Sequence, residues 1–182
     1  AYLRGYRPMA QAKTAEEWIR CLKLTPHPEG GYFRESYRSS GQIAEPSLPD
    51  GMKGERCYGT AIYFLLGAGQ VSRWHRIKSD ELWFYHAGSP LEVIMLLNDG
   101  VEKNLQLGLD LAAGQQPHVM VPAGCWFGSR LMTGRDTYCL VSCTVSPGFD
   151  FKDFQLATAQ DAEKWPALWK HPELLPVMSA GR

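Results

Sequence analysis

A series of short β-like runs between residues 57 and 146 constrains the fold of this chain more than any other feature. Turn residues separate the runs, and Asp99-Gly100 forms a good hairpin turn between two of them. They read CYGTAIYFLL, QVSRWHRI, ELWFYHA, LEVIMLLN, VEKNLQLG, HVMVP, CWFGSRL and DTYCLVSCTV. So many short strands in one domain predict a sandwich, a jelly roll or a barrel.

Helical segments are predicted on both sides of these runs. TAEEWIRCLKL is the clearest helix, because Thr14 and Glu17 have the spacing of a capping box and an apolar stripe follows them. The tail is predicted to form short helices, with Thr158 as a cap and prolines that limit their length. We therefore expect an N-terminal extension over residues 1–13 and a single domain over residues 14–182.

Composition narrows the classes of partner and compartment. The 182 residues carry 19 basic and 19 acidic side chains, so neither nucleic acid nor an anionic membrane surface is an expected partner. No stretch approaches 18 unbroken apolar residues, so no membrane-spanning helix is expected. The five cysteines include no Cys-x-x-Cys pair, which predicts buried, reduced thiols in a cytoplasmic protein.

The stretch GAGQVSRWHRIKSDELWFYHAG (67–88) concentrates the residues that can carry chemistry. In an alternating strand, His75 and Ile77 share one face, and after a turn Glu81, Trp83 and Tyr85 share another. A hairpin between the two strands can bring His75 and Glu81 together in the interior of a barrel. We therefore expect a His75–Glu81 pair in a pocket.

These residues resemble the first motif of the cupin superfamily. Gly69, His75, Glu81 and Gly88 fit its spacing, but Ile77 stands where the motif has a second histidine. The second cupin motif is a Pro-x-Gly turn followed by a ligand histidine. Here the turn is Pro-Ala-Gly, and Phe127 takes the place of that histidine.

Four longer blocks resemble one cupin family of unknown function that is related to sugar-nucleotide epimerase-like cupins. The blocks are HPEGGYFRESYRS (27–39), HRIKSDELWFYHAG (75–88), LDLAAGQQPHVMVPAGCWFG (109–128) and YCLVSCTVSPGFDFKDFQL (138–156). The resemblance implies an all-β cupin β-barrel or jelly roll with an N-terminal helix and short C-terminal helices. It also implies a homodimer, which the apolar second face of the 82–86 strand favours.

The missing histidines bear on whether a metal binds. Familiar cupin metal centres use three histidines and one glutamate, and only His75 and Glu81 remain here. A catalytic transition metal generally needs at least three protein donors. We therefore expect no metal and no other cofactor, although a metal centre with a reduced ligand set stays open as a less favoured alternative.

Metal-independent acid–base chemistry is the favoured alternative. A histidine beside a carboxylate is an oriented general base, so His75 and Glu81 are the predicted catalytic pair. The resemblance to epimerase-like cupins adds a tyrosine acid. Tyr85, Tyr138 and Tyr32 are the candidates, none of which the sequence singles out, and Tyr85 is grouped with His75 and Glu81 as the predicted catalytic set. The competing interpretation is that the pair is a structural hydrogen bond in a decayed pocket.

Further residues are expected to line the pocket and bind the ligand. They are Tyr32, Arg34, Ile77, Trp83, Phe127 and Tyr138. The run HPEGGYFRE contains Gly30-Gly31, which predicts a bulge or a close backbone approach. That geometry can place Glu29, Tyr32 or Arg34 at the site, whereas the simpler interpretation is a twisted edge strand. His27 is expected to be a surface or capping group.

Two functions remain open from the sequence. One is a metal-independent epimerase- or isomerase-like enzyme that acts on a sugar- or nucleotide-like small molecule. The other is a small-molecule-binding or sensing cupin without catalysis. A metal-dependent cupin oxygenase or isomerase with a reduced ligand set is the less favoured third.

Overall fold

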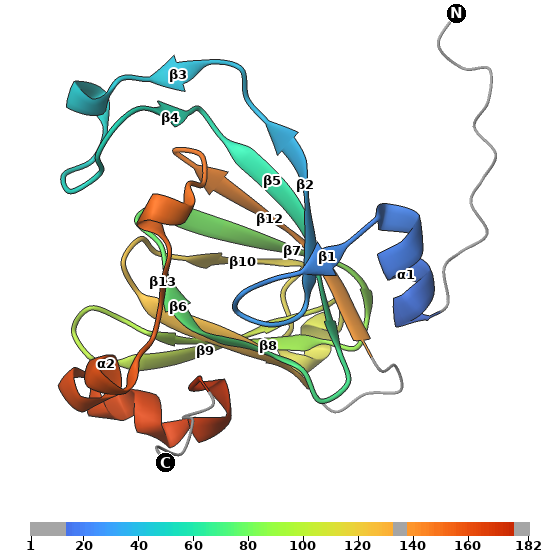
Figure 1. The fold of residues 1–182 in the computed structure, drawn as a ribbon. Coiled ribbons are helices and arrows are strands. Elements are labelled where there is room, and N and C mark those ends of the chain that lie inside the picture. Colours follow the sequence, from blue (N-terminus) through green and yellow to red (C-terminus); the bar gives the residue numbers. More distant parts are fainter. Residues whose placement is uncertain (1–13, 133–137, 177–182) are drawn as a thin grey trace, which may run out of the picture.

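The computed structural model describes residues 14–132 and 138–176, and the extension predicted for residues 1–13 lies outside them. Antiparallel strands in two facing sheets form the body of the described chain (Figure 1). Their order is that of a jelly roll, in which neighbours in a sheet are distant in sequence. The predicted all-β cupin fold is confirmed.

The six-stranded sheet has the order β1-β2-β5-β12-β7-β10. Its strands are β1 (Thr25–Pro26), β2 (Tyr32–Arg38), β5 (Thr60–Gly67), β12 (Tyr138–Ser146), β7 (Asp80–Gly88) and β10 (His118–Val121). The five-stranded sheet consists of β13 (Gln155–Leu156), β6 (Val71–Arg76), β11 (Trp126–Leu131), β8 (Leu91–Leu96) and β9 (Glu102–Leu107). A small separate hairpin pairs β3 (Gln42–Ile43) with β4 (Arg56–Cys57).

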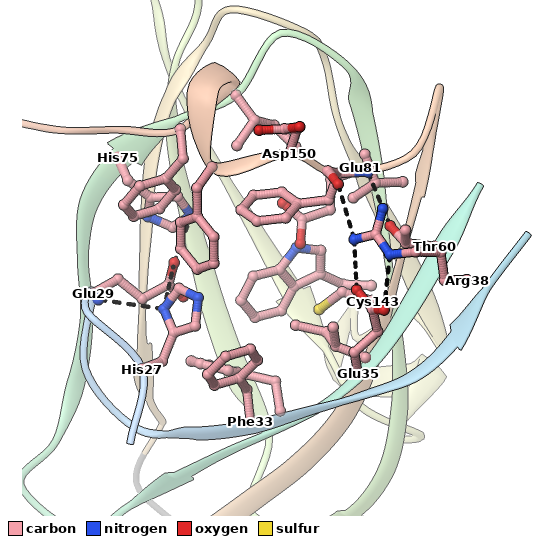
Figure 2. A pocket seen from close by; sticks show the side chains of 18 residues that line it. His27, Glu29, Phe33, Glu35, Arg38, Thr60, His75, Glu81, Cys143 and Asp150 are labelled. Atoms are coloured by element: carbon pink, nitrogen blue, oxygen red, sulfur yellow. Dashed lines mark hydrogen bonds and ion pairs between the residues drawn. The ribbon is translucent and has the colours of Figure 1, made fainter. Parts of the chain in front are cut away.

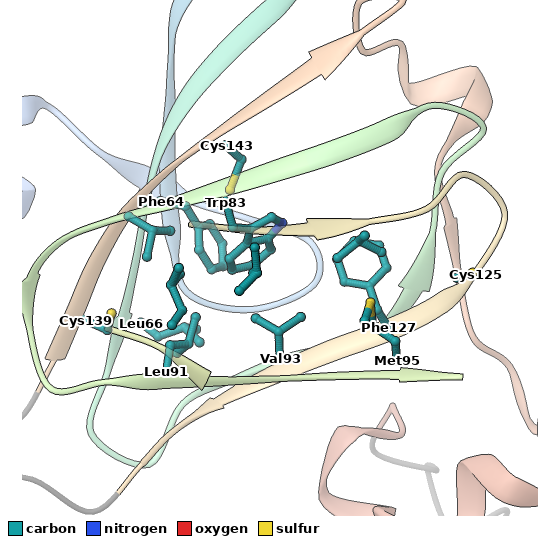
Figure 3. Packing of buried hydrophobic residues seen from close by; sticks show 14 residues of the cluster. Phe64, Leu66, Trp83, Leu91, Val93, Met95, Cys125, Phe127, Cys139 and Cys143 are labelled. Carbon is teal, nitrogen blue, oxygen red and sulfur yellow. The ribbon is translucent and has the colours of Figure 1, made fainter. Parts of the chain in front are cut away.

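Side chains from the facing sides of the two sheets form the main core (Figure 3). In strand β8, the side chains alternate between the inner and the outer face of the sheet. Leu91, Val93 and Met95 point between the sheets, whereas Ile94 and Leu96 point to the outer face. Both faces are buried, which explains why this strand reads as a continuous apolar run.

Helices cover the outer faces of both sheets. Helix α1 (Ala15–Leu22) begins at the predicted capping box and packs on the six-stranded sheet. Helix α2 (Ala159–Lys164) is capped by Thr158, as predicted, and precedes the short helices η4 (Pro166–Lys170) and η5 (Pro172–Leu174). This C-terminal group covers the outer face of the five-stranded sheet. Three further short helices are η1 (Glu45–Ser47), η2 (Leu111–Ala113) and η3 (Phe151–Asp153).

Two β-bulges place polar side chains on the inner face. Opposite β11, the register of β6 shifts so that Ser72 and His75 both point inward although three positions separate them. Opposite β5, the register of β2 shifts between Glu35 and Tyr37, and Arg38 then lies on the same face as Glu35. Simple alternation would have placed Tyr37 there instead.

The loop between β1 and β2 is docked on β6. The amide N–H of Arg73 donates to the carbonyl oxygen of Glu29 at 2.8 Å. Gly30 has a φ of +116°, and a Cβ at this position would lie 2.1 Å from the carbonyl oxygen of Val71. Only glycine permits this close approach, which confirms the prediction from Gly30-Gly31.

Two more predictions concern the state of the cysteines and the lack of a membrane-spanning helix. All five cysteines are reduced, and four of them are buried as predicted, but Cys21 is exposed on the outer side of α1. Among the described residues, no helix is long and apolar enough to cross a membrane.

Candidate functional site

A cavity of about 350 Å³ opens between the two sheets at one end of the jelly roll. Strands of the six-stranded sheet, the docked loop, β6 and the segment 149–154 form its walls (Figure 2). The lining residues are His27, Glu29, Phe33, Glu35, Arg38, Thr60, Ile62, Phe64, His75, Ile77, Glu81, Trp83, Cys143, Val145, Phe149, Asp150, Phe151 and Phe154.

His75 is held by contacts to both of its ring nitrogens. Its Nδ1 lies 2.7 Å from the carbonyl oxygen of Arg73. Because a carbonyl only accepts, Nδ1 must carry a hydrogen and donate it. Its Nε2 lies 3.1 Å from Oε2 of Glu29. The ring packs on Phe127 with the two ring centroids 4.0 Å apart, so its orientation is fixed.

Glu29 is buried beside His75 at the turn of the docked loop. The hydroxyl of Ser72 donates to its Oε1 at 2.8 Å. Its Oε2 lies 3.5 Å from Nδ1 of His27, a nitrogen that also accepts the backbone N–H of Glu29. These contacts place Glu29 Oε2 and His75 Nε2 so that a single proton can lie between them.

Burial favours the uncharged forms of this pair. It lowers the pKa of His75 to about 3, a shift that the Arg73 carbonyl opposes and the neighbouring His27 reinforces. Burial raises the pKa of Glu29 well above its usual value, and the charge of Glu81 adds to that rise while Ser72 opposes it. Burial therefore favours a carboxylic acid at Glu29 and a neutral imidazole at His75, with Oε2 and Nε2 3.1 Å apart.

Glu81 is a second buried carboxyl on the cavity wall, contributed by β7. Burial raises its pKa to about 7, while the Cys143 thiol and the Trp83 indole oppose the rise. The indole N–H of Trp83 has no hydrogen-bond partner of acceptable geometry among the described residues. Glu81 thus titrates near neutral pH.

The predicted pairing of His75 with Glu81 is wrong. Nε2 of His75 contacts Glu29, which comes from a loop far away in sequence, instead of Glu81 from the next strand. His27, expected at the surface, has a side chain only 7% exposed and lines the cavity. Its burial lowers its pKa to about 4, so it is uncharged at neutral pH.

An arginine–glutamate pair stands on the other side of the cavity from His27 and Glu29 (Figure 2). Nε and Nη2 of Arg38 donate to the two carboxylate oxygens of Glu35 at 2.9 and 2.7 Å. Nη2 also donates to the carbonyl oxygen of Phe149 at 3.1 Å. Both side chains are partly exposed, so they mark the polar rim of the cavity.

A buried ion pair anchors the segment that forms the aromatic wall. Nε and Nη2 of Arg56 donate to Oδ2 and Oδ1 of Asp153 at 2.7 and 2.9 Å. The pair holds η3 against β4, and the residues around it, Phe149, Phe151 and Phe154, line the cavity. Bidentate, buried pairs of this kind fix geometry closely.

Four of the nine predicted site residues lie on the cavity wall: His75, Ile77, Glu81 and Trp83. Phe127 is fully buried beneath the His75 ring and does not line the cavity. Tyr85 lies farther along β7, packs on the main core and donates its hydroxyl to the carbonyl oxygen of Gly88.

The other three predicted residues lie outside the cavity, since alternation turns them to the outer face of the six-stranded sheet. Tyr32 and Tyr138 join the cluster beneath α1, where the Tyr138 hydroxyl accepts the indole N–H of Trp18 at 3.1 Å. The guanidinium of Arg34 lies over the Tyr63 ring, 5.7 Å from its centroid. None of the three lines the cavity.

The described residues do not fit a familiar cupin metal centre. They contain no group of three or more histidine, cysteine, aspartate or glutamate side chains arranged to hold a metal ion. Of the ring nitrogens of His75, one donates to a carbonyl and the other contacts Glu29. Ile77 and Phe127 fill the places of the other histidines with apolar volume. We route no chemistry through a metal.

Two facing antiparallel sheets that enclose a cavity at one end define the class of cupin proteins. The chain belongs to the family described as the Cupin superfamily (DUF985), whose model matches residues 16–157. The resemblance of the four sequence blocks to a cupin family of unknown function is therefore confirmed.

Relatives of this chain carry descriptions that name no activity. A hypothetical protein from Leishmania major is 38% identical with a TM-score of 0.77, over 87% of this chain and 98% of that one. Protein SO0799 from Shewanella oneidensis is 39% identical with a TM-score of 0.75, over 91% and 99%. The uncharacterised protein YML079W of Saccharomyces cerevisiae is 28% identical over 86% of this chain and 82% of its own length.

More distant structures share the fold alone. A cupin-2 domain from Rhodospirillum rubrum is 16% identical with a TM-score of 0.53, over 84% of this chain and 88% of that one. A Bacillus subtilis oxalate decarboxylase is 14% identical with a TM-score of 0.51, over 82% and 36%.

Proposed function

We propose that the cavity binds a small organic molecule and exchanges a proton with it, as a metal-independent isomerase- or epimerase-like enzyme does. The observation that carries this proposal is the buried His75–Glu29 pair on the cavity wall. Both groups have pKa values displaced toward their uncharged forms. Displaced pairs of this kind, in a cavity, are typical of acid–base sites.

The contacts of the pair define a route for one proton. A proton leaving the bound molecule moves to Glu29, and the proton of Glu29 moves onto Nε2 of His75. The Arg73 carbonyl, which already accepts from Nδ1, stabilises the imidazolium that forms. The reverse transfer returns a proton to the same or a neighbouring atom of the ligand. No oxidant, reductant or second substrate is needed.

The dimensions of the cavity limit the ligand. A volume of about 350 Å³ is at the lower end of the range for small-molecule sites. A single sugar-like ring agrees with this size, and the resemblance to epimerase-like cupins favours the same class. A nucleotide attached to such a ring would have to extend past the rim at Arg38.

Deuterium incorporation from solvent tests the proposal. Sugar-like carbonyl compounds are incubated with the protein in heavy water, and loss of their C–H signals is followed by proton NMR. His75→Gln and Glu29→Gln are expected to slow exchange by about 100-fold or more, the usual contribution of a positioned acid or base. The control is Glu163→Gln, which alters an exposed carboxyl group on α2.

The second candidate is a binding cupin without catalysis. It is favoured by the way Glu29 and His75 satisfy each other without a ligand. Compounds that bind to the wild-type protein but never exchange a proton would support it. Exchange that persists in both His75→Gln and Glu29→Gln would contradict the proposed reaction.

The proposed assembly is a homodimer formed through the outer face of the six-stranded sheet. In the register of β10 and β7, Met120 lies beside Leu82 and His118 beside Phe84, and Met120 is 45% exposed. Apolar side chains in such a row favour a covered face. Sedimentation equilibrium is expected to give twice the chain mass, and Met120→Glu to give a monomer. A monomeric wild-type protein would contradict this assembly.

A further inference from the structure

The charges of the cavity wall are unbalanced. Four carboxyl groups line it, and they belong to Glu29, Glu35, Glu81 and Asp150. The only permanently charged cation among the described lining residues is Arg38. The two histidines on the wall are buried, and burial disfavours their charged forms. Burial favours the uncharged form of Glu29, but Glu35, Glu81 and Asp150 still offer more negative charge to a ligand than Arg38 offers positive charge.

The single cation is already engaged. Arg38 donates two parallel hydrogen bonds to Glu35 and a third to the carbonyl oxygen of Phe149. An anionic ligand would have to displace the Glu35 carboxylate from this bidentate contact, which is among the stronger side-chain contacts in proteins. The wall thus contains no free counter-charge for an anion.

Glu81, in contrast to Arg38, has no partner of opposite charge among the described residues. Its residue is 7% exposed and faces the cavity, but no cationic side chain among the described residues forms an ion pair with it. Its neighbours are the Cys143 thiol and the Trp83 indole, and neither carries a positive charge. A buried carboxyl without a counter-charge is costly to ionise, so a cation in the cavity would be strongly attracted to it.

Aromatic rings supply the second element of a cation site. Phe149 and Phe151 have ring centroids 5.0 Å apart, and those of Phe151 and Phe154 are 5.9 Å apart. All three belong to the segment that forms one wall, and Phe33 and Trp83 contribute from the strands. The faces of such rings attract ammonium groups within about 6 Å.

We propose that the cavity selects a ligand that carries a protonated amine or a quaternary ammonium group, held between the Glu81 carboxylate and the aromatic wall. The inference rests on the cavity of the proposed function but does not require that any proton be transferred. It narrows the substrate class from small polar molecules in general to organic cations with a compact, partly apolar body.

Three probes of one shape test this selection by isothermal titration calorimetry. Benzylammonium, benzyl alcohol and benzoate each present one ring with a cationic, neutral or anionic end. Benzylammonium is expected to bind about tenfold more tightly than benzyl alcohol, or better, as a desolvated cation–π contact beside a carboxylate predicts. Benzoate is expected to bind most weakly.

Variants separate the role of Glu81 from that of general surface charge. Glu81→Gln keeps the shape of the side chain and is expected to abolish the preference for benzylammonium over benzyl alcohol. Glu163→Gln, on the exposed side of α2, removes the same charge elsewhere and should leave the preference intact. Circular dichroism and thermal unfolding confirm that each variant is folded.

Several outcomes would overturn the inference. They are tighter binding of benzoate or benzyl alcohol than of benzylammonium, binding of none of the three at millimolar concentration, or an unchanged preference in folded Glu81→Gln. Failure of the proposed function is measured separately, because it concerns proton exchange and the variants of His75 and Glu29. The cation preference can hold without exchange, and exchange can hold without it.

Discussion

The space between the two sheets has a filled half and an open half, and the same strands build both. In the filled half, aliphatic side chains such as Leu66, Leu91 and Leu107 meet from opposite sheets. These residues have almost no exposed surface. In the open half, the inward positions carry Glu81 on β7 and His75 on β6. Apolar packing fills one end of this space, and buried titratable side chains are concentrated at the other.

A layer of aromatic rings separates the two halves. Phe64 lies 5.6 Å from Trp83, and Trp83 lies 6.2 Å from Phe127, measured between ring centroids. The His75 ring rests on Phe127 from the open side. This rigid layer lets the open half carry buried titratable groups without disturbing the core. Substitutions in the two halves should therefore have different consequences.

The largest effect is expected from the ion pair that anchors the aromatic wall of the open half. Asp153→Ala leaves the Arg56 guanidinium buried without its partner and should lower the free energy of unfolding by about 3 to 5 kcal/mol. Urea denaturation measures this loss. The nearby exposed Glu55→Ala is the control, and an equal loss in both variants would show that the pair has no special role.

In the filled half, Leu107→Ala removes a side chain with no exposed surface. The lost burial and the remaining cavity should lower the free energy of unfolding by about 3 kcal/mol. Leu109→Ala, at a position that is 65% exposed, should change it by less than about 0.5 kcal/mol. Benzylammonium binding should survive in folded Leu107→Ala, and its loss would contradict the separation of the two halves.

The pKa of Glu81 makes the stability of the open half depend on pH. Its folded pKa of about 7 exceeds the ordinary value of 4.5, so the folded state holds the proton more tightly. The stability that this raised pKa contributes is fully present below about pH 4.5 and is lost as the pH rises through about 7. The free energy of unfolding falls by up to ~3 kcal/mol over this range. The glutamine side chain in Glu81→Gln cannot titrate. The free energy of unfolding of this variant, relative to that of the wild type, should therefore rise as the pH increases across this range.

Urea denaturation of both proteins across this pH range checks this expectation. Glu29, His27 and His75 also titrate differently in the folded and unfolded states, but they are present in both proteins. Because the charge of Glu81 also raises the pKa of Glu29, the difference between the two curves reports Glu81 together with this coupling. A constant difference at all pH values would show that Glu81 has an ordinary pKa.

The smallest effect on stability is expected at the rim of the cavity. Phe151 is 54% exposed although it belongs to the aromatic wall, so Phe151→Ala should change the free energy of unfolding by less than about 1 kcal/mol. The same variant should weaken benzylammonium binding several-fold, because it removes one face of the cage. Unchanged affinity, measured by calorimetry, would exclude this ring from the site.

Strand alternation allowed part of the site to be predicted from the sequence. It correctly turned His75, Ile77, Glu81 and Trp83 toward one interior, because alternation holds from His75 onward, past the bulge in β6, and at Glu81 and Trp83 on β7. It could not show how far along a strand the cavity extends. Tyr85 lies on the same strand as Glu81 but packs on the filled core.

Irregular backbone accounts for most of what the sequence did not reveal. The β2 bulge brings Arg38 to the cavity, whereas simple alternation would have placed Tyr37 there. The docked loop brings Glu29 and His27 beside His75 through backbone contacts that have no periodic signal. The block SPGFDFKDF, noted only as part of a resemblance, supplies the aromatic wall.

The central claim is that the open half is organised around an uncharged His75–Glu29 pair. Nitrogen-15 NMR of histidine-labelled protein, with His75→Gln used for assignment, measures the protonation of both ring nitrogens directly. The predicted result is a neutral ring with its hydrogen on Nδ1, unchanged as the pH falls from neutral to about 5. An imidazolium signal from His75 at neutral pH, or a hydrogen on Nε2 instead of Nδ1, would contradict the claim.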